Sequence, residues 1–225
     1  MKLNTDLTKR ATCNINQQHW ETSPSAGVDR LRIECDDEQP PVERVTTIVR
    51  FAPGSQFSGH VHGGGEEFLV LDGIFSDQYA DFPTGSYVRN PKGTGHAPHS
   101  DEGCTILVKL WQMHADDQQQ FSINTHDETL WQKNNNLGDI LPLFSADYET
   151  VCMMRWPAGT QLNNLEFPGG VEYFILQGSF SDQQDSYTAG SWLRLPANSM
   201  QNIQVKENCL VLQKSGHLKQ PITYV

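Results

Sequence analysis

GSQFSGHVHGGGEEFLVLDGIFSDQYADFPTGSYVRNP, residues 54–91, is matched 105 residues later by GTQLNNLEFPGGVEYFILQGSFSDQQDSYTAGSWLRLP, residues 159–196. Extended to residues 50–110 and 155–215, the two copies align without a gap, and 20 of the 61 aligned positions are identical. Turn-forming residues keep their register between the copies, as in Gly73 with Gly178, Gly85 with Gly190 and Pro91 with Pro196. A fixed period of this kind indicates an internal duplication, with one structural unit in each copy.

Each copy contains short apolar or alternating runs that are bounded by Gly, Pro, Asp and Asn, which is typical of β-strands. The clearest runs are Val45 to Phe51, Glu67 to Leu71, Thr105 to Leu110 and Tyr173 to Leu176. No window shows a helical stripe with caps. We therefore predict an all-β chain of two tandem jelly-roll β-barrels. The expected domains are residues 1–115 and 116–225, joined through the polar run His114 to Asp127.

Composition narrows the classes of partner. The 225 residues carry 16 Lys and Arg against 27 Asp and Glu, a net charge of −11. This charge repels phosphate backbones and anionic lipids, so we expect neither nucleic-acid nor membrane partners. No stretch is long and apolar enough for a membrane span, and the polar start, Met1 to Asn14, has no signal-peptide core. We expect a cytoplasmic protein.

The five cysteines are widely spaced and include no C-x-x-C pair, so the sequence predicts neither a zinc ribbon nor a disulfide framework. They are Cys13, Cys35, Cys104, Cys152 and Cys209. Buried, unpaired thiols are the expected state.

Four of the eight histidines fall between residues 60 and 99. His60 and His62 share one side of a strand, and Glu66 keeps that parity if the intervening glycine turn does not shift the register. His96 follows a later turn, from which it can face the same barrel. Three imidazoles and a carboxylate are a ligand set for a divalent transition metal, and the competing interpretation is a group of surface histidines around a flexible loop.

The second copy argues for the metal. At the offset of 105, the four candidate ligands become Leu165, Phe167, Val171 and Gln201. Three of these are bulky apolar residues, which suit a barrel interior filled without metal. The comparison also separates the two adjacent glutamates, because Glu67 persists as Glu172 in the copy that lacks ligands. We therefore predict one metal site per chain, made by His60, His62, Glu66 and His96.

These residues carry a family resemblance. The order Gly54, His60-x-His62, Glu66, Gly73 matches the first cupin motif, and Gly85, Pro91-x-Gly93, His96 matches the second. The chain thus resembles a bicupin whose C-terminal copy is degenerate. The amino-acid sequence around the site is similar to that of the ChrR-type anti-sigma factors, in which a cupin domain binds zinc and takes part in sensing oxidative stress. By this resemblance the metal is zinc, with iron(II), nickel and manganese as alternatives.

Two functions follow from the resemblance. The first is a metal-dependent binding protein that senses stress or a small molecule. The second is a cupin dioxygenase acting on a small diketone or hydroxyaryl ketone. In ChrR-type proteins a separate domain with a zinc-binding C-x-x-C pair binds the sigma factor. This chain contains no such pair. A sigma factor is therefore a partner by resemblance only, and a homodimer is an open alternative. Four protein ligands saturate a tetrahedral zinc, whereas an octahedral metal keeps two positions open for oxygen and substrate.

Three further residues near the motifs, one histidine and two aromatic residues, are candidates for the surroundings of the site. His99 has the opposite strand parity to His96, so we expect it outside the site; Tyr87 and Phe68 are candidate pocket residues. Arg89 persists with Glu67 in the second copy, as Arg194 with Glu172. This retention predicts a carboxylate–guanidinium bridge, with two parallel hydrogen bonds, in each barrel.

Overall fold

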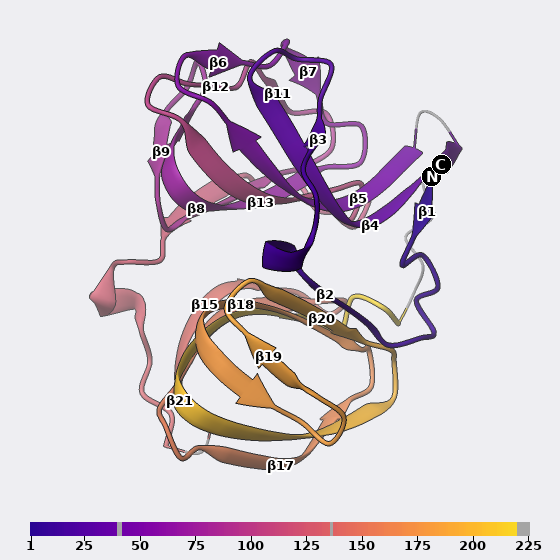
Figure 1. Cartoon of the computed structure of the whole chain (residues 1–225), viewed down its shortest axis with the longest axis vertical. Coiled ribbons are helices and arrows are strands. Elements are labelled where there is room, and N and C mark those ends of the chain that lie inside the picture. The colour runs from indigo at the N-terminus through magenta and orange to yellow at the C-terminus, as the bar shows by residue number, and fades with distance from the viewer. Residues whose placement is uncertain (40–41, 136, 220–225) are drawn as a thin grey trace. The chain divides into compact units, whose positions relative to one another are not determined.

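A computed structural model describes residues 1–39, 42–135 and 137–219. The described chain is built from β-strands with two short 3-10 helices and contains no α-helix. Neither 3-10 helix is long enough to cross a membrane. The ribbon of each half closes into a barrel (Figure 1). The prediction of an all-β chain with two tandem barrels is confirmed.

Contacts divide the described residues into two compact units. The N-terminal unit contains residues 1–5 and 18–126, and the C-terminal unit contains residues 6–17 and 127–219. These limits differ from the expected boundary between residues 115 and 116, because a short segment near the start of each expected domain pairs with the other barrel.

Thirteen strands form the N-terminal unit: β1 (Lys2–Leu3), β3 (Glu21–Thr22), β4 (Val28–Gln39), β5 (Val42–Phe51), β6 (Ser55–Gln56), β7 (His60–Val61), β8 (Glu66–Ser76), β9 (Asp81–Pro83), β10 (Ser86–Asn90), β11 (Gly95–His96), β12 (His99–Ser100), β13 (Cys104–Leu110) and β14 (Phe121–Asn124). The main sheet has the order β1-β4-β5-β13-β8-β10-β14, and β7 pairs separately with β11. β8 lies between β13 and β10 in this sheet, and its first five residues, Glu66–Val70, are buried.

The C-terminal unit comprises β2 (Ala11–Asn14), η1 (Ile15–Gln17), η2 (Glu128–Leu130), β15 (Asp139–Ser145), β16 (Thr150–Trp156), β17 (Gln161–Phe167), β18 (Val171–Ser181), β19 (Ser186–Thr188), β20 (Ser191–Leu195) and β21 (Ser199–Ser215). Its sheet has the order β15-β16-β21-β18-β20-β2, with β17 paired to β21 and β19 to β18.

The duplicated glycines mark the bend of the longest shared strand. Gly73, in β8, has φ of +74°, and a Cβ there would lie 2.0 Å from the Gly103 carbonyl oxygen. Gly178, in β18, has φ of +71°, and its Cβ would lie 1.9 Å from the Asn208 carbonyl oxygen. Only glycine combines this backbone conformation with so close an approach, so the strand bends at the same place in both barrels.

Edge strands are exchanged between the two expected domains, residues 1–115 and 116–225. β14 follows the first barrel in sequence and pairs with β10, with Phe121 opposite Arg89. β2 precedes that barrel in sequence but pairs with β20 of the C-terminal unit, where Ala11 lies opposite Arg194. Each barrel thus covers one sheet edge with a segment from the other expected domain.

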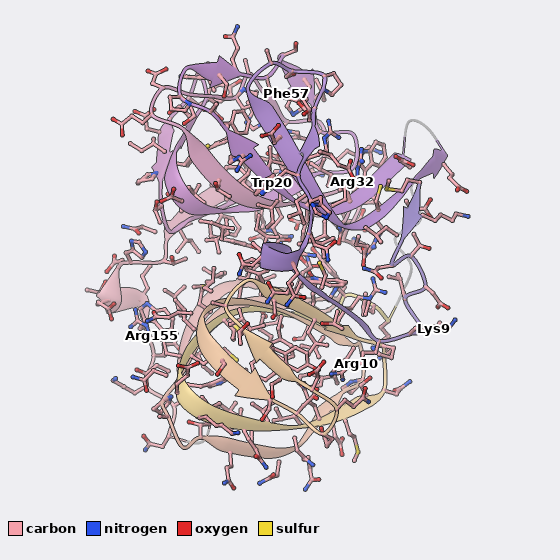
Figure 2. The ribbon with its side chains drawn as sticks, in the orientation of Figure 1. Lys9, Arg10, Trp20, Arg32, Phe57 and Arg155 are labelled. Carbon is pink, nitrogen blue, oxygen red and sulfur yellow. The ribbon has the colours of Figure 1, made fainter. Side chains whose placement is uncertain are left out.

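Apolar side chains form a core in each barrel, and Figure 2 draws the side chains on the ribbon. The N-terminal core includes Phe51, Phe68, Phe75, Val88 and Ile106. The C-terminal core is more aromatic, with Trp156, Tyr173, Phe180 and Tyr187, and the partly buried Leu165 and Phe167 pack against it. All five cysteines are free; four are buried and Cys13 is half-buried. Burial raises the pKa of the Cys152 and Cys209 thiols to about 12, so these side chains remain protonated at neutral pH.

Candidate metal centre

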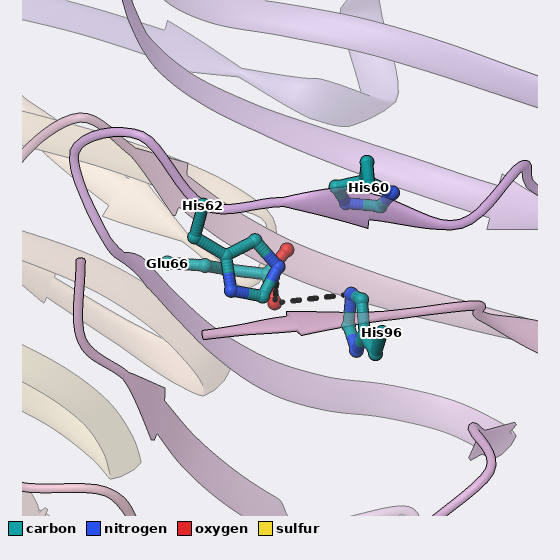
Figure 3. A group of neighbouring side chains, drawn as sticks. All are labelled: His60, His62, Glu66 and His96. Atoms are coloured by element: carbon teal, nitrogen blue, oxygen red, sulfur yellow. Dashed lines mark ion pairs between the residues drawn. The ribbon is translucent and has the colours of Figure 1, made fainter. Parts of the chain in front are cut away.

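The predicted ligand residues converge in the N-terminal barrel (Figure 3). One donor atom from each of His60, His62, Glu66 and His96 lies within 4.8 Å of the others, a grouping that could hold a metal ion. His60 and His96 face each other across the β7–β11 pair. His62 follows β7, and Glu66 begins β8. His60 is exposed, whereas the other three side chains are buried, so solvent reaches the cluster from one side.

A tight glycine turn connects His62 to Glu66. A Cβ at Gly63 would lie 2.4 Å from the Trp111 ring, and one at Gly64 would lie 2.5 Å from it. Gly65 has φ of +78°, which disfavours other residues. Glycines therefore allow the turn to pack against Trp111 and to return the chain so that both side chains reach one point.

Each imidazole of the cluster is held through its Nδ1 atom. His60 Nδ1 donates to the Ser58 carbonyl at 2.9 Å, and His96 Nδ1 donates to Asp77 Oδ2 at 3.1 Å. His62 Nδ1 lies 3.0 Å from Thr94 Oγ1.

The partners fix the tautomers. Since the Thr94 hydroxyl donates its proton to the Pro91 carbonyl at 2.7 Å, it accepts a hydrogen bond from His62. All three rings therefore carry the Nδ1 proton and present an Nε2 lone pair for coordination.

The Nε2 atoms meet the Glu66 carboxylate. His62 Nε2 and His96 Nε2 each lie 3.5 Å from Glu66 Oε2, as the dashed lines in Figure 3 mark. Both nitrogens are buried, and neither has a hydrogen-bond partner in the part of the chain that the structure describes. Lone pairs facing a carboxylate in this way are electrostatically unfavourable unless a cation lies between them, so the donor set fits a bound metal ion.

Burial sets the protonation of the cluster. Desolvation, together with the neighbouring His96 and His60, lowers the pKa of His62 to about 3. Desolvation also lowers the pKa of His96, although Asp77 opposes this shift. Burial raises the pKa of Glu66 to about 7, despite the hydrogen bond that Asn90 Nδ2 donates to it at 3.1 Å. The buried imidazoles are therefore neutral at neutral pH, as metal ligation requires.

The second barrel repeats the backbone arrangement without the ligands. Leu165 lies opposite Gln201 in the β17–β21 pair, as His60 lies opposite His96. Gln201 Nε2 donates to Asp182 Oδ2 at 3.0 Å, so the acid that holds the imidazole in the first barrel holds an amide here. The alignment of the two copies thus corresponds to equivalent positions in space.

Glu67 faces away from the cluster. Its carboxylate accepts hydrogen bonds from the Tyr87 hydroxyl at 3.0 Å and from Arg89 Nη1 at 3.3 Å. Arg89 Nη2 donates to Asp117 Oδ2 at 2.5 Å, so the buried guanidinium reaches two different carboxylates. The predicted Glu67–Arg89 pair is confirmed, whereas two parallel hydrogen bonds between these side chains stay a prediction. The guanidinium also binds Asp117, an acid that the repeat comparison had missed.

The second copy keeps the strand register of this pair. Glu172 lies opposite Arg194 in the β18–β20 pair. Glu172 Oε1 accepts a hydrogen bond from Trp192 Nε1 at 2.6 Å, and Arg194 Nη2 donates to the Asp6 carbonyl at 3.0 Å. A direct Glu172–Arg194 bridge stays a prediction.

A cavity of about 190 Å³ adjoins the cluster. Its walls are mainly apolar and include Phe57, Phe75, Ile106, Val108 and Trp111, together with all four residues of the cluster. The suggested pocket residues Tyr87 and Phe68 are not among those that line it: both are buried, Tyr87 bonded to Glu67 and Phe68 in the core. His99 pairs with Gln56 and Ser76, outside the cluster, as its parity predicted.

Sequence reasoning missed the residues that orient the ligands. Asp77 had a usable signal, since it lies in the FSDQ segment that recurs as residues 180–183. Thr94 and Ser58 had none, because their roles depend on turns between strands, and Asn90 had none because its contact depends on the β8–β10 register, in which it lies opposite Glu66.

A family model for the ChrR cupin-like domain matches the chain twice, over residues 8–114 and 118–219. Curated protein sequences gave no match. Among solved structures, the chain is similar to a "putative dioxygenase" from Nostoc punctiforme, with 13% identity, a TM-score of 0.77, and coverage of 96% of this chain and 86% of that chain.

Two other solved structures share the fold. A bacterial pirin from Escherichia coli in complex with nickel(II) has 13% identity and a TM-score of 0.68, with coverage of 92% and 98%. A cupin 2 conserved barrel domain protein from Leptotrichia buccalis has 14% identity and a TM-score of 0.63, with coverage of 96% and 99%.

Proposed function

Because the chain belongs to the ChrR cupin-like family, with both barrels matched, we propose that it binds one divalent metal ion and senses a small molecule or an oxidative signal at that ion. His60, His62, Glu66 and His96 are the proposed ligands, and zinc is the proposed metal. The cytoplasm is the proposed location.

The observation that carries the metal proposal is the pair of buried Nε2 atoms that face Glu66 without hydrogen-bond partners among the described residues. Zinc is bound by neutral imidazole and carboxylate groups at about 2.0 to 2.2 Å, and a tetrahedral set at that length separates its donors by about 3.4 Å. The 3.5 Å separations in the cluster are close to this spacing.

A second candidate function is a metal-dependent dioxygenase. The apolar cavity beside the cluster favours it, because a substrate needs room next to the metal. A redox-active ion such as iron(II) would supply the oxygen chemistry when bound, whereas zinc does not change oxidation state. Small diketones and hydroxyaryl ketones are the substrates to test.

Metal analysis of the full chain, purified without chelator or a nickel affinity column, tests the proposal. We expect one equivalent of zinc and no oxygen consumption with the candidate ketones. Stoichiometric iron with oxygen uptake would favour the dioxygenase, and a chain that binds no divalent metal would overturn both functions.

A matched pair of histidine variants tests the ligand assignment. His62→Ala should lose the metal, because the remaining ligands lack a strong imidazole donor. His99→Ala should retain it, because that side chain lies outside the cluster. Equal metal content in the two variants would refute the assignment.

A further inference from the structure

An arginine without a partner lines the cavity beside the metal cluster. Arg30, in β4, is partly buried and belongs to the cavity wall. Its backbone pairs within the sheet, but its guanidinium has no hydrogen bond or ion pair among the described residues. Its neighbours on β4 and β5 differ in this respect, since Arg32 (labelled in Figure 2) pairs with Glu21, and Arg50 pairs with Asp29 at 2.8 Å.

A cation beside an apolar cavity is costly unless an anion or water satisfies it. Apart from its histidines, the cavity is lined by two ionisable side chains, the guanidinium of Arg30 and the carboxyl group of Glu66. With a divalent ion bound and neutral imidazoles, the ion and Arg30 would supply three positive charges, and the carboxylates of Glu66 and of Asp77, which holds His96, would supply two negative charges. An anionic ligand would therefore be favoured in this cavity, although the whole chain carries −11.

Size and lining restrict the body of such a ligand. A cavity of about 150 Å³ lined by aliphatic and aromatic side chains accepts benzene, and the present cavity has about 190 Å³. It can hold one ring or a branched chain with a few additional atoms. Phe57, Phe75 and Trp111 provide aromatic contacts for that body.

We propose that the N-terminal barrel binds a small carboxylate with a compact aromatic or branched apolar body, the carboxylate on Arg30 and the body in the cavity beside the metal. The planar guanidinium fork matches a carboxylate with two parallel hydrogen bonds. This inference rests on the proposed metal-binding function and names the class of small molecule that it would sense.

Calorimetric titration of the full, metal-loaded chain with benzoate tests the proposal. Benzyl alcohol and benzylammonium, which share the ring and replace the carboxylate with a neutral or a cationic group, are the comparison ligands. Benzoate should bind at least tenfold more tightly than either. Arg30→Gln should weaken benzoate binding about tenfold or more and leave benzyl alcohol unchanged, since charge-assisted hydrogen bonds to one ligand group are lost.

Arg50→Gln is the matched control, because Arg50 lies on the adjacent strand and its partner is Asp29. It should bind benzoate as the unsubstituted chain does. Metal content and thermal unfolding, measured on both variants, confirm that each is folded and loaded.

The outcomes separate the two proposals. Loaded protein that binds benzoate no better than benzyl alcohol, or that keeps this preference in Arg30→Gln, overturns the carboxylate site and leaves the metal function standing. Arg30-dependent benzoate binding by a chain that takes up no metal supports the carboxylate site and refutes the metal function.

Discussion

The two adjacent glutamates at the start of β8, Glu66 and Glu67, contact different groups. Glu66 points into the barrel and meets His62 and His96, whereas Glu67 points the other way and meets Tyr87 and Arg89. Strand alternation alone predicted opposite directions for the two glutamates, and the second copy indicated which one faces the cluster. Strand alternation did not predict Asp77 and Thr94, which bind the Nδ1 atoms of His96 and His62, because both residues lie in loops.

Asp77 holds His96 through the Nδ1 hydrogen bond, and Asp182 holds Gln201 in the barrel without ligands. We predict that Asp77→Asn lowers metal affinity by about 10- to 100-fold, because it removes the carboxylate that fixes ring orientation and raises ligand basicity. Competition with a chromophoric chelator measures the change. Asp182→Asn is the internal control and should leave the affinity unchanged; an equal loss in both variants would show a general structural effect instead.

Arg89 is fully buried between the carboxylates of Glu67 and Asp117. Arg89→Met should destabilise the N-terminal unit by about 3 to 5 kcal/mol, because it leaves buried carboxylates without their cation. Urea unfolding gives the difference. Lys2→Met, which removes an exposed pair with Glu38, should cost no more than about 1 kcal/mol. A similar small cost at Arg89 would mean that the buried pair contributes little.

At the scale of elements, the sequence predicted strands and their bounding turns but not the exchange of β2 and β14. Hydrophobic alternation locates a strand and says nothing about which edge it covers. The segments 11–14 and 121–124 are only four residues long and lie outside the aligned repeat, so no comparison between the copies could place them. Their pairing follows from backbone hydrogen bonding along an open edge.

The double substitution Thr12→Pro, Cys13→Pro tests the role of β2. Successive amides of an edge strand point in opposite directions, so two consecutive prolines remove at least one ladder hydrogen bond to β20 whatever the register. We expect a lower unfolding temperature of the C-terminal unit and an unchanged metal content. Calorimetry and metal analysis report these two quantities. Gln18→Pro, beyond η1, should leave both unchanged, and loss of metal in the double variant would contradict the assignment of β2 to the C-terminal unit.

For the whole molecule, the duplication produces one barrel with a cavity and one barrel with a filled core. One barrel keeps an open interior beside His60, His62, Glu66 and His96, and the other fills the equivalent space around Leu165. This difference was predictable because three of the four candidate ligand positions change to apolar residues while glycines persist. The cavity itself was not, because its walls come from strands far apart in the sequence.

Chelation should therefore act on one half of the chain. At a metal concentration 100 times the dissociation constant, binding stabilises the folded unit by about 2.7 kcal/mol. We predict that removal of one equivalent of metal lowers the unfolding temperature of the N-terminal unit and leaves that of the C-terminal unit in place, as followed by scanning calorimetry. His62→Ala should show no response to chelator. Release of two equivalents, or a shift of both transitions, would disprove the single-site assignment.

The pairing of β2 with β20 also constrains the order in which the chain folds on the ribosome. Ala11 is opposite Arg194, so residues near the start of the chain wait for partners synthesised much later. At about 5 to 20 residues per second, that delay is roughly 10 to 40 seconds. During this interval the first barrel can close through β4, β5, β8 and β13, while β2 has no β20 to pair with. The last stage of biogenesis is then the capture of an early segment by a late barrel, a non-local closure that is intrinsically slow.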